Sequence, residues 1–177
     1  MSTEALWDFG RGSGVVALVL VTVSVVLGIL TRRGEPIGGL PRFAVTEVHR
    51  NASLLSVAFL ALHAGLLMFD PYAQLRIFDA VVPFAAGYRP FWQGLGTVAL
   101  DLIVALVVTS LLRHRLGRRV WRAIHWLAYA LWPLAVAHAV GTGTDASSAW
   151  FLALATVCVV TVAGAAGWRF TRKELAR

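Results

Sequence analysis

Four histidines are the residues best suited to chemistry in this otherwise apolar chain. His49 and His63 lie fourteen residues apart in one apolar stretch, and His125 and His138 lie thirteen apart in another. At a rise of about 1.5 Å per residue, each pair spans roughly 20 Å along a helix. If both helices begin at the same membrane face, His49 is level with His125, and His63 is level with His138.

Two imidazoles that face each other at one depth can ligate a haem iron from both sides. The two levels therefore predict two haem b groups, one held by His49 and His125 and the other by His63 and His138. Zinc fits less well, because each level offers only two ligands and no cysteine or paired carboxylate joins them. Purely structural histidines are the remaining alternative, although ionisable groups inside membrane spans are costly and usually mark function.

The angle around the helix between the two histidines differs between the two apolar stretches. At about 100° per residue, fourteen residues return His63 to within roughly 40° of the face that carries His49. Thirteen residues leave His138 well away from the face of His125. Pro133 lies between them and removes one backbone hydrogen bond, so we expect a kink there that brings His138 round to its haem.

The composition predicts how these residues are positioned. The 177 residues are 58% hydrophobic, with a mean hydropathy of +0.72 and apolar runs that approach twenty residues. This is typical of an all-α integral membrane protein, and one bundle of five transmembrane helices is expected as a single domain over residues 1–177. The spans are expected at about residues 14–31, 46–69, 95–112, 120–140 and 149–170. Leu75 to Phe84 is expected to form a short interfacial helix between the second and third spans.

The charge pattern predicts the orientation. The net charge of +7 comes mainly from arginines in the short segments between the apolar runs and in the tail, so no nucleic-acid partner is expected. Basic segments stay in the cytoplasm during insertion, which places the N-terminus outside and the C-terminus in the cytoplasm. His49 and His125 then lie near the cytoplasmic face. We expect an integral protein of a bacterial cell (inner) membrane, in contact with lipid.

Other residues near the histidines have weaker predicted roles. Arg50 and Arg122 flank the inner ligands and could pair with haem propionates, or they could be ordinary inside-face arginines. Trp132 lies midway between His125 and His138, where its ring could shorten an electron path or simply pack. Asp101, in the third span, is expected to pair with an outer arginine or with the free N–H of a ligating histidine.

These residues resemble the ferric-reductase-like transmembrane domain superfamily, which includes NADPH oxidases, ferric reductases and the bacterial haem subunit of the periplasmic methionine sulfoxide reductase. The match is H-x13-H on one span, an intervening span, a basic segment, and H-x12-H on the next, and it covers about residues 10–170. The resemblance implies two b-type haems stacked across the membrane, with electrons moving outward from the cytoplasmic side. Arg11 resembles the arginine that family members place near the outer haem and the acceptor site.

The sequence departs from the oxidases in having five expected spans, and its 177 residues contain no glycine-rich phosphate motif of a flavin or nicotinamide domain. We therefore expect the haem-binding subunit of an oxidoreductase rather than a complete enzyme, and no motif indicates a bound flavin. The donor is expected to be a separate cytoplasmic flavin reductase or a quinol. The acceptor is expected to be an extracytoplasmic redox protein, ferric iron or oxygen. A quinol-oxidising cytochrome b-type anchor of a larger complex and a non-redox membrane scaffold are the alternatives.

Overall fold

The computed structural model describes residues 3–31, 41–73 and 75–174, and within these ranges the chain forms helices and connecting loops without a strand. The all-α prediction is therefore confirmed. The described residues form seven helices: α1 (Thr3–Thr31), α2 (Arg42–Met68), α3 (Ile77–Val81), α4 (Pro90–Leu111), α5 (Arg113–His125), α6 (Ala128–Thr142) and α7 (Ala149–Glu174).

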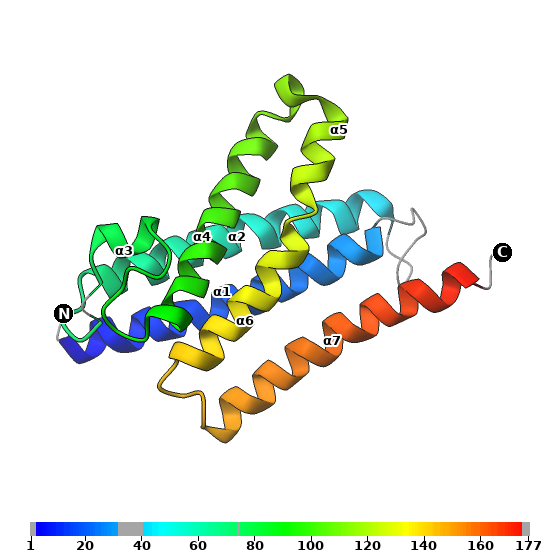
Figure 1. The fold of residues 1–177 in the computed structure, drawn as a ribbon. Helices are drawn as coiled ribbons and strands as arrows, with labels where there is room; N and C mark the ends of the chain where they lie inside the picture. Colours follow the sequence, from blue (N-terminus) through cyan, green and yellow to red (C-terminus); the bar gives the residue numbers. More distant parts are fainter. Residues whose placement is uncertain (1–2, 32–40, 74, 175–177) are drawn as a thin grey trace.

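Four of the described helices, α1, α2, α4 and α7, are each long and apolar enough to cross a membrane. The pair α5 and α6 also meets this requirement as one broken span, bent by 44°. Figure 1 shows that α1 begins and α7 finishes at opposite ends of the bundle, which agrees with five spans if the bent pair is counted as one of them. Which end faces the cytoplasm stays a prediction from the charge pattern.

The bundle consists of two helix pairs that meet at α1. Helix α1 packs most extensively against α2 and also contacts α6 and α7, whereas α4 packs against α6 (Figure 1). The buried core joins the two pairs, with Val21, Val25 and Ile29 from α1 against Ala99 and Ile103 from α4 and Leu131 from α6. Because lipid is as apolar as these side chains, close packing holds the helices together more than exclusion of water does.

Two segments that were expected to be irregular are helical. Helix α1 begins at Thr3, well before the expected start at residue 14, and Glu4 in its first turn favours the positive end of the helix dipole. The basic segment after α4 forms the first turns of α5, interrupted at Gly117, where φ is 75°. Glycine tolerates this left-handed backbone because it has no Cβ. A short helix, α3, is present within the segment where an interfacial helix was expected, and it is shorter than predicted.

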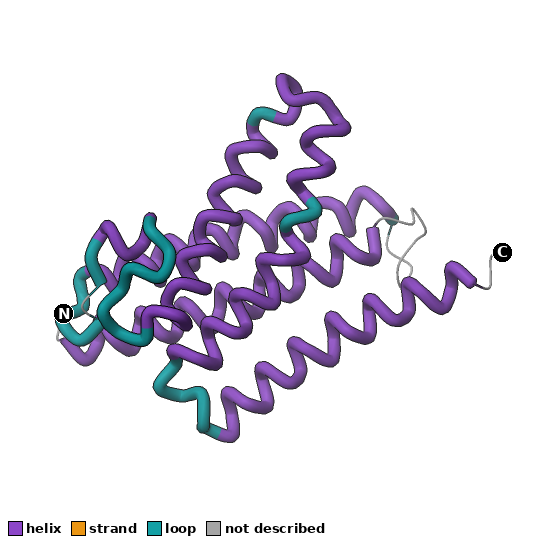
Figure 2. The backbone as a smooth tube through the Cα atoms, in the orientation of Figure 1, coloured by secondary structure: helices purple, strands orange, loops and turns teal. Residues whose placement is uncertain are grey.

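The fourth span was expected over residues 120–140 with a kink or local rewinding at Pro133, but the structure breaks it earlier, between α5 and α6. The helix breaks at Trp126 and Leu127 (Figure 2), and Pro133 lies inside α6. At the break the amides of Leu127 and Ala130 donate to carbonyls only three residues back, at 2.9 and 3.0 Å. Such tight turns advance about 120° per residue instead of about 100°, so a few of them rotate the following residues by tens of degrees. The break therefore provides the rotation that was expected from the proline.

Candidate functional site

The structure brings the four histidines together in two facing pairs. His49 of α2 faces His125 at the end of α5, with ring centres 6.4 Å apart and ring planes at 83°. His63 of α2 faces His138 of α6, with ring centres 6.5 Å apart and ring planes at 78°. We call these pairs the inner and outer levels, after the orientation that the charge pattern predicts. Both contain the partners that the sequence spacing paired.

The ring separations match two imidazoles on one metal atom. A metal–imidazole nitrogen bond is about 2.0–2.1 Å long. In a five-membered ring with bonds of about 1.33 Å, each nitrogen lies about 1.1 Å from the ring centre. An atom coordinated on opposite sides by two imidazoles therefore holds their ring centres about 6.2–6.4 Å apart, which is close to the observed 6.4 and 6.5 Å. The histidine pairs thus fit axial ligation of a haem iron.

Hydrogen bonds define the tautomer of three histidines. The Nδ1 atom of each lies within hydrogen-bond distance of a backbone carbonyl of a neighbouring helix, in the pairs His49–Ser24 (2.9 Å), His63–Gly10 (2.7 Å) and His138–Trp92 (2.9 Å). A carbonyl oxygen only accepts, so Nδ1 carries the proton and donates it. Nε2 then keeps its lone pair, which is the arrangement found in metal-ligating histidines.

His125 is supported by an aromatic side chain. It is the last residue of α5, and its ring stacks on Trp121 with the centres 5.1 Å apart and the planes at 22°. Residues four apart on a helix lie on the same face, so the sequence carried this signal. Trp121 was nevertheless not among the predicted site residues.

A cavity of about 390 Å³ lies at the outer level and is lined by both outer histidines. This volume falls in the usual range for small-molecule and cofactor sites. Apolar residues of α1, α2, α4 and α6 form most of its wall, including Leu60, Leu100 and Leu131. A largely apolar wall with two converging imidazoles suits a porphyrin, whose faces are apolar and whose metal takes axial nitrogens.

Arg11 also lines this cavity. Its guanidinium forms an ion pair with Asp145 in the turn between α6 and α7, and it lies 3.9 Å from Asp8. The structure therefore places Arg11 beside the outer level, where the family resemblance put it, with its charge already matched by carboxylates.

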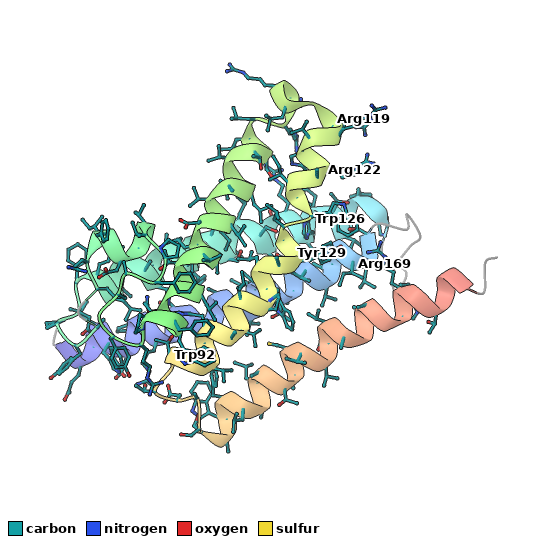
Figure 3. The ribbon with its side chains drawn as sticks, viewed as in Figure 1. Trp92, Arg119, Arg122, Trp126, Tyr129 and Arg169 are labelled. Carbon is teal, nitrogen blue, oxygen red and sulfur yellow. The ribbon has the colours of Figure 1, made fainter. Side chains whose placement is uncertain are left out.

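Arg50 and Arg122 lie away from the described cavity. Arg50 is 3.7 Å from Glu47, and both side chains are more than half exposed. An exposed pair of this kind contributes little to stability, so Arg50 could exchange partners at small cost. Figure 3 shows Arg119 and Arg122 on α5 at the same end of the bundle as Arg169 of α7. Their shared position agrees with the charge bias from which the orientation was inferred.

Trp132 lies on α6 between the two levels and packs against the buried core. Its indole N–H donates to the hydroxyl of Thr22 on α1 at 2.9 Å, and that hydroxyl donates to the carbonyl of Leu18 at 2.8 Å. The ring is therefore held in one orientation. Thr22 could not be predicted from the sequence, because a threonine in an apolar helix usually bonds only to its own backbone.

The prediction that Asp101 pairs with an outer arginine or with the N–H of one of the paired histidines is wrong. Asp101 is exposed on α4, and across the described part of the chain it makes no ion pair and no hydrogen bond through its side chain. Val104 and Val108, three and seven residues further on, are also exposed. This spacing places all three on the outward face of α4, whereas Ile103 points into the core.

The helices and their composition define the chain as an integral membrane protein with histidine pairs between its helices. Residues 13–136 match the family described as ferric reductase like transmembrane component. This match covers most of the chain, which therefore belongs to the ferric reductase-like transmembrane family. The matched segment includes His49, His63 and His125 and ends two residues before His138. No curated protein and no solved structure matches the chain.

Proposed function

We propose that the chain is a di-haem b electron-transfer protein that carries electrons across a membrane. The family supports transmembrane electron transfer in general. The observation that carries the finer proposal is the pair of facing histidine levels, with ring centres 6.4 and 6.5 Å apart. His49 and His125 would hold the inner haem, and His63 and His138 the outer one.

Haem would supply one-electron exchange, and the protein would set the conditions for it. With two histidines on each iron no coordination position would be open, so electrons would pass to and from haem without a substrate binding the metal. Donation of Nδ1–H to a carbonyl makes an imidazole a stronger electron donor, which favours the oxidised iron. The wall of the outer level is largely apolar, which would lower the polarity around a haem there. Trp132, held by Thr22, would place a fixed aromatic ring between the two levels.

The electron donor is proposed to be a separate cytoplasmic flavin reductase or a quinol, and the acceptor an extracytoplasmic redox protein, ferric iron or oxygen. This direction rests on the basic residues that gather at the inner end, such as Arg119, Arg122 and Arg169 (Figure 3). The proposed location is the cell membrane of a bacterium.

The test is an optical spectrum of purified protein, reduced minus oxidised, with the ratio of haem to protein. We expect b-type bands and two haems per chain after expression with added haem. Each of His49→Ala, His63→Ala, His125→Ala and His138→Ala should lose the haem of its own level, and His114→Ala is the matched control because His114 lies in neither pair. Wild-type protein that folds without haem would refute the proposal.

A further inference from the structure

The three carbonyls that accept hydrogen bonds from the histidines share a sequence feature. In each case the residue four positions further along the same helix is a glycine: Gly10 is followed by Gly14, Ser24 by Gly28, and Trp92 by Gly96. The pattern occurs twice on α1 and once on α4, and it serves histidines on α2 and α6.

Helix geometry explains why the position matters. The carbonyl of residue i accepts the amide of residue i+4, and it retains a second lone pair for another donor. Side chains on a helix lean toward its N-terminus, so the side chain of residue i+4 covers the turn that contains carbonyl i. A glycine at i+4 leaves this lone pair open to a side chain from a neighbouring helix.

The space beside these glycines is filled by the imidazoles. A Cβ atom at Gly14 would lie 2.7 Å from Cε1 and Nδ1 of His63, and one at Gly96 would lie 2.5 Å from the same atoms of His138. At both positions the three nearest atoms all belong to the histidine. A Cβ at Gly28 would lie 3.5 Å from Cε1 of His49, which is an ordinary contact.

General helix packing does not explain this arrangement. Small residues in membrane helices usually let two backbones approach each other. At Gly10, for example, a Cβ would meet Leu66 and Leu67 of the neighbouring helix. At Gly14 and Gly96 the first atoms met are those of a ring whose Nδ1 is already hydrogen-bonded to the carbonyl one turn earlier.

We propose that Gly14 and Gly96 are positioning residues for the outer histidines. Each leaves open a backbone carbonyl that fixes the tautomer and the direction of Nε2, and Gly28 does the same less tightly for His49. The positions and tautomers of the imidazole rings are properties of the protein itself. The effect of the glycines on haem binding, by contrast, rests on the proposed function.

The experiment compares Gly14→Ala, Gly96→Ala and Gly28→Ala with two matched controls. Gly12 and Gly65 are also helical glycines, and a Cβ at either meets nothing within 4 Å. The measurements are the haem content of each level, the midpoint potentials, the electron paramagnetic resonance (EPR) spectrum of the ferric haems, and thermal unfolding. We expect Gly14→Ala and Gly96→Ala to weaken outer-haem binding by about 10- to 100-fold, the usual effect of losing a partner behind a metal ligand.

The other variants define the comparison. In Gly14→Ala and Gly96→Ala the inner-haem signal should persist, Gly28→Ala should shift only the inner signal, and Gly12→Ala and Gly65→Ala should match wild type. Retention of both haems with wild-type potentials and EPR signals in Gly14→Ala and Gly96→Ala would overturn the inference and leave the proposed function standing.

A second measurement does not depend on the variants or on haem. In wild-type protein labelled with ¹⁵N-histidine, nitrogen chemical shifts report which ring nitrogen is protonated. The inference requires neutral His63 and His138 with the proton on Nδ1, and a proton on Nε2 at either would refute it even if the alanine variants fail to fold. Wild-type protein that binds no haem but shows these tautomers would reject the proposed function alone.

Discussion

The outer and inner levels have nearly the same ring separation but are supported differently. At the outer level both histidines donate to a carbonyl, and both line the cavity of about 390 Å³. At the inner level His49 donates to the carbonyl of Ser24, and His125 stacks on Trp121 at a helix end. The same ligand chemistry is thus supported by helix backbone at one level and partly by an aromatic ring at the other.

Helix α4 shows where the two levels diverge. Trp92 supplies the carbonyl that accepts the hydrogen bond from His138. His125 and His138 are thirteen residues apart, and thirteen residues after Trp92 the residue on α4 is Ala105. Four residues after Ala105 is Thr109, and its hydroxyl donates to the carbonyl of Ala105 at 2.6 Å. At the outer level the residue four positions after the carbonyl is Gly96, and an imidazole fills the space beside it. At the inner level the corresponding residue is Thr109, which bonds within its own helix. The repeat of the two levels is therefore incomplete on α4.

The largest effect should follow from removing an outer ligand. His138→Ala leaves His63 without a facing imidazole, so the outer haem should be lost while the inner haem remains, because its ligands lie on α2 and α5. One of two ferric EPR signals should disappear. Loss of both haems would show that the two levels are not independent, and loss of neither would show that His138 does not hold the outer haem.

A smaller effect is expected from the aromatic support of His125. Trp121→Leu keeps an apolar side chain but removes the stacking, which contributes about 0.5–1.5 kcal/mol in aromatic pairs. Inner-haem affinity should fall by about 2- to 10-fold, measured by haem titration, with the outer haem unaffected. Trp150→Leu on α7 is the matched control, since Trp150 is exposed and stacks on no histidine. An equal loss at both levels would contradict the comparison.

The hydrogen bond between Trp132 and Thr22 should have a modest effect shared by both levels. Trp132→Phe keeps the ring and removes the donor, at a cost of about 0.5–1.5 kcal/mol in the free energy of unfolding. Thr22→Val removes the acceptor, and the double variant should cost little more than either single one. Thermal unfolding of the four proteins measures this coupling. Additive losses would show that the bond contributes nothing.

The smallest effect concerns pH and the outer level alone. Arg76 donates two hydrogen bonds to Asp79, which is buried and whose backbone carbonyl accepts from Thr97 of α4. The hydrogen bonds from Arg76 hold the pKa of Asp79 below its ordinary value. A lowered folded-state pKa stabilises the fold above the unfolded value of about 3.9, and this stabilisation is lost as pH falls through the folded value.

The check is thermal unfolding followed from about pH 5 downward. Asp79→Asn should remove this part of the acid sensitivity, and Asp8→Asn is the control because the side chain of Asp8 is largely exposed. The outer haem should be released before the inner one in wild type, since Asp79 supports the segment beside α4. Identical acid profiles for wild type and Asp79→Asn would contradict this.

Much of the site could be predicted from spacing. The intervals of fourteen and thirteen residues predicted which histidines face each other, because depth along a helix follows residue number. Gly14 and Gly28 are also fourteen residues apart, which is the spacing of His49 and His63, so the glycine pattern was readable as well. The carbonyls that accept from the histidines could not be predicted, because every residue has a carbonyl and the sequence does not show which of them a side chain of another helix reaches.

The helix break was predicted in the wrong place for a related reason. Pro133 is the strongest local signal in the fourth crossing, yet it lies well inside α6. The break falls at Trp126 and Leu127, whose types carry no breaking tendency of their own. His125 stacks on Trp121 on one side of the break, and α6 packs against α4 on the other. Contacts between helices are invisible to local propensity.

That break has a mechanical consequence. His125 ends α5 and His138 lies within α6, so this one crossing carries its two histidines on two separate helical segments. The orientation of His138 is fixed by the carbonyl of Trp92, and that of His125 by stacking on Trp121. A change in the bend between the two segments would therefore alter the angle between the two rings without breaking either support.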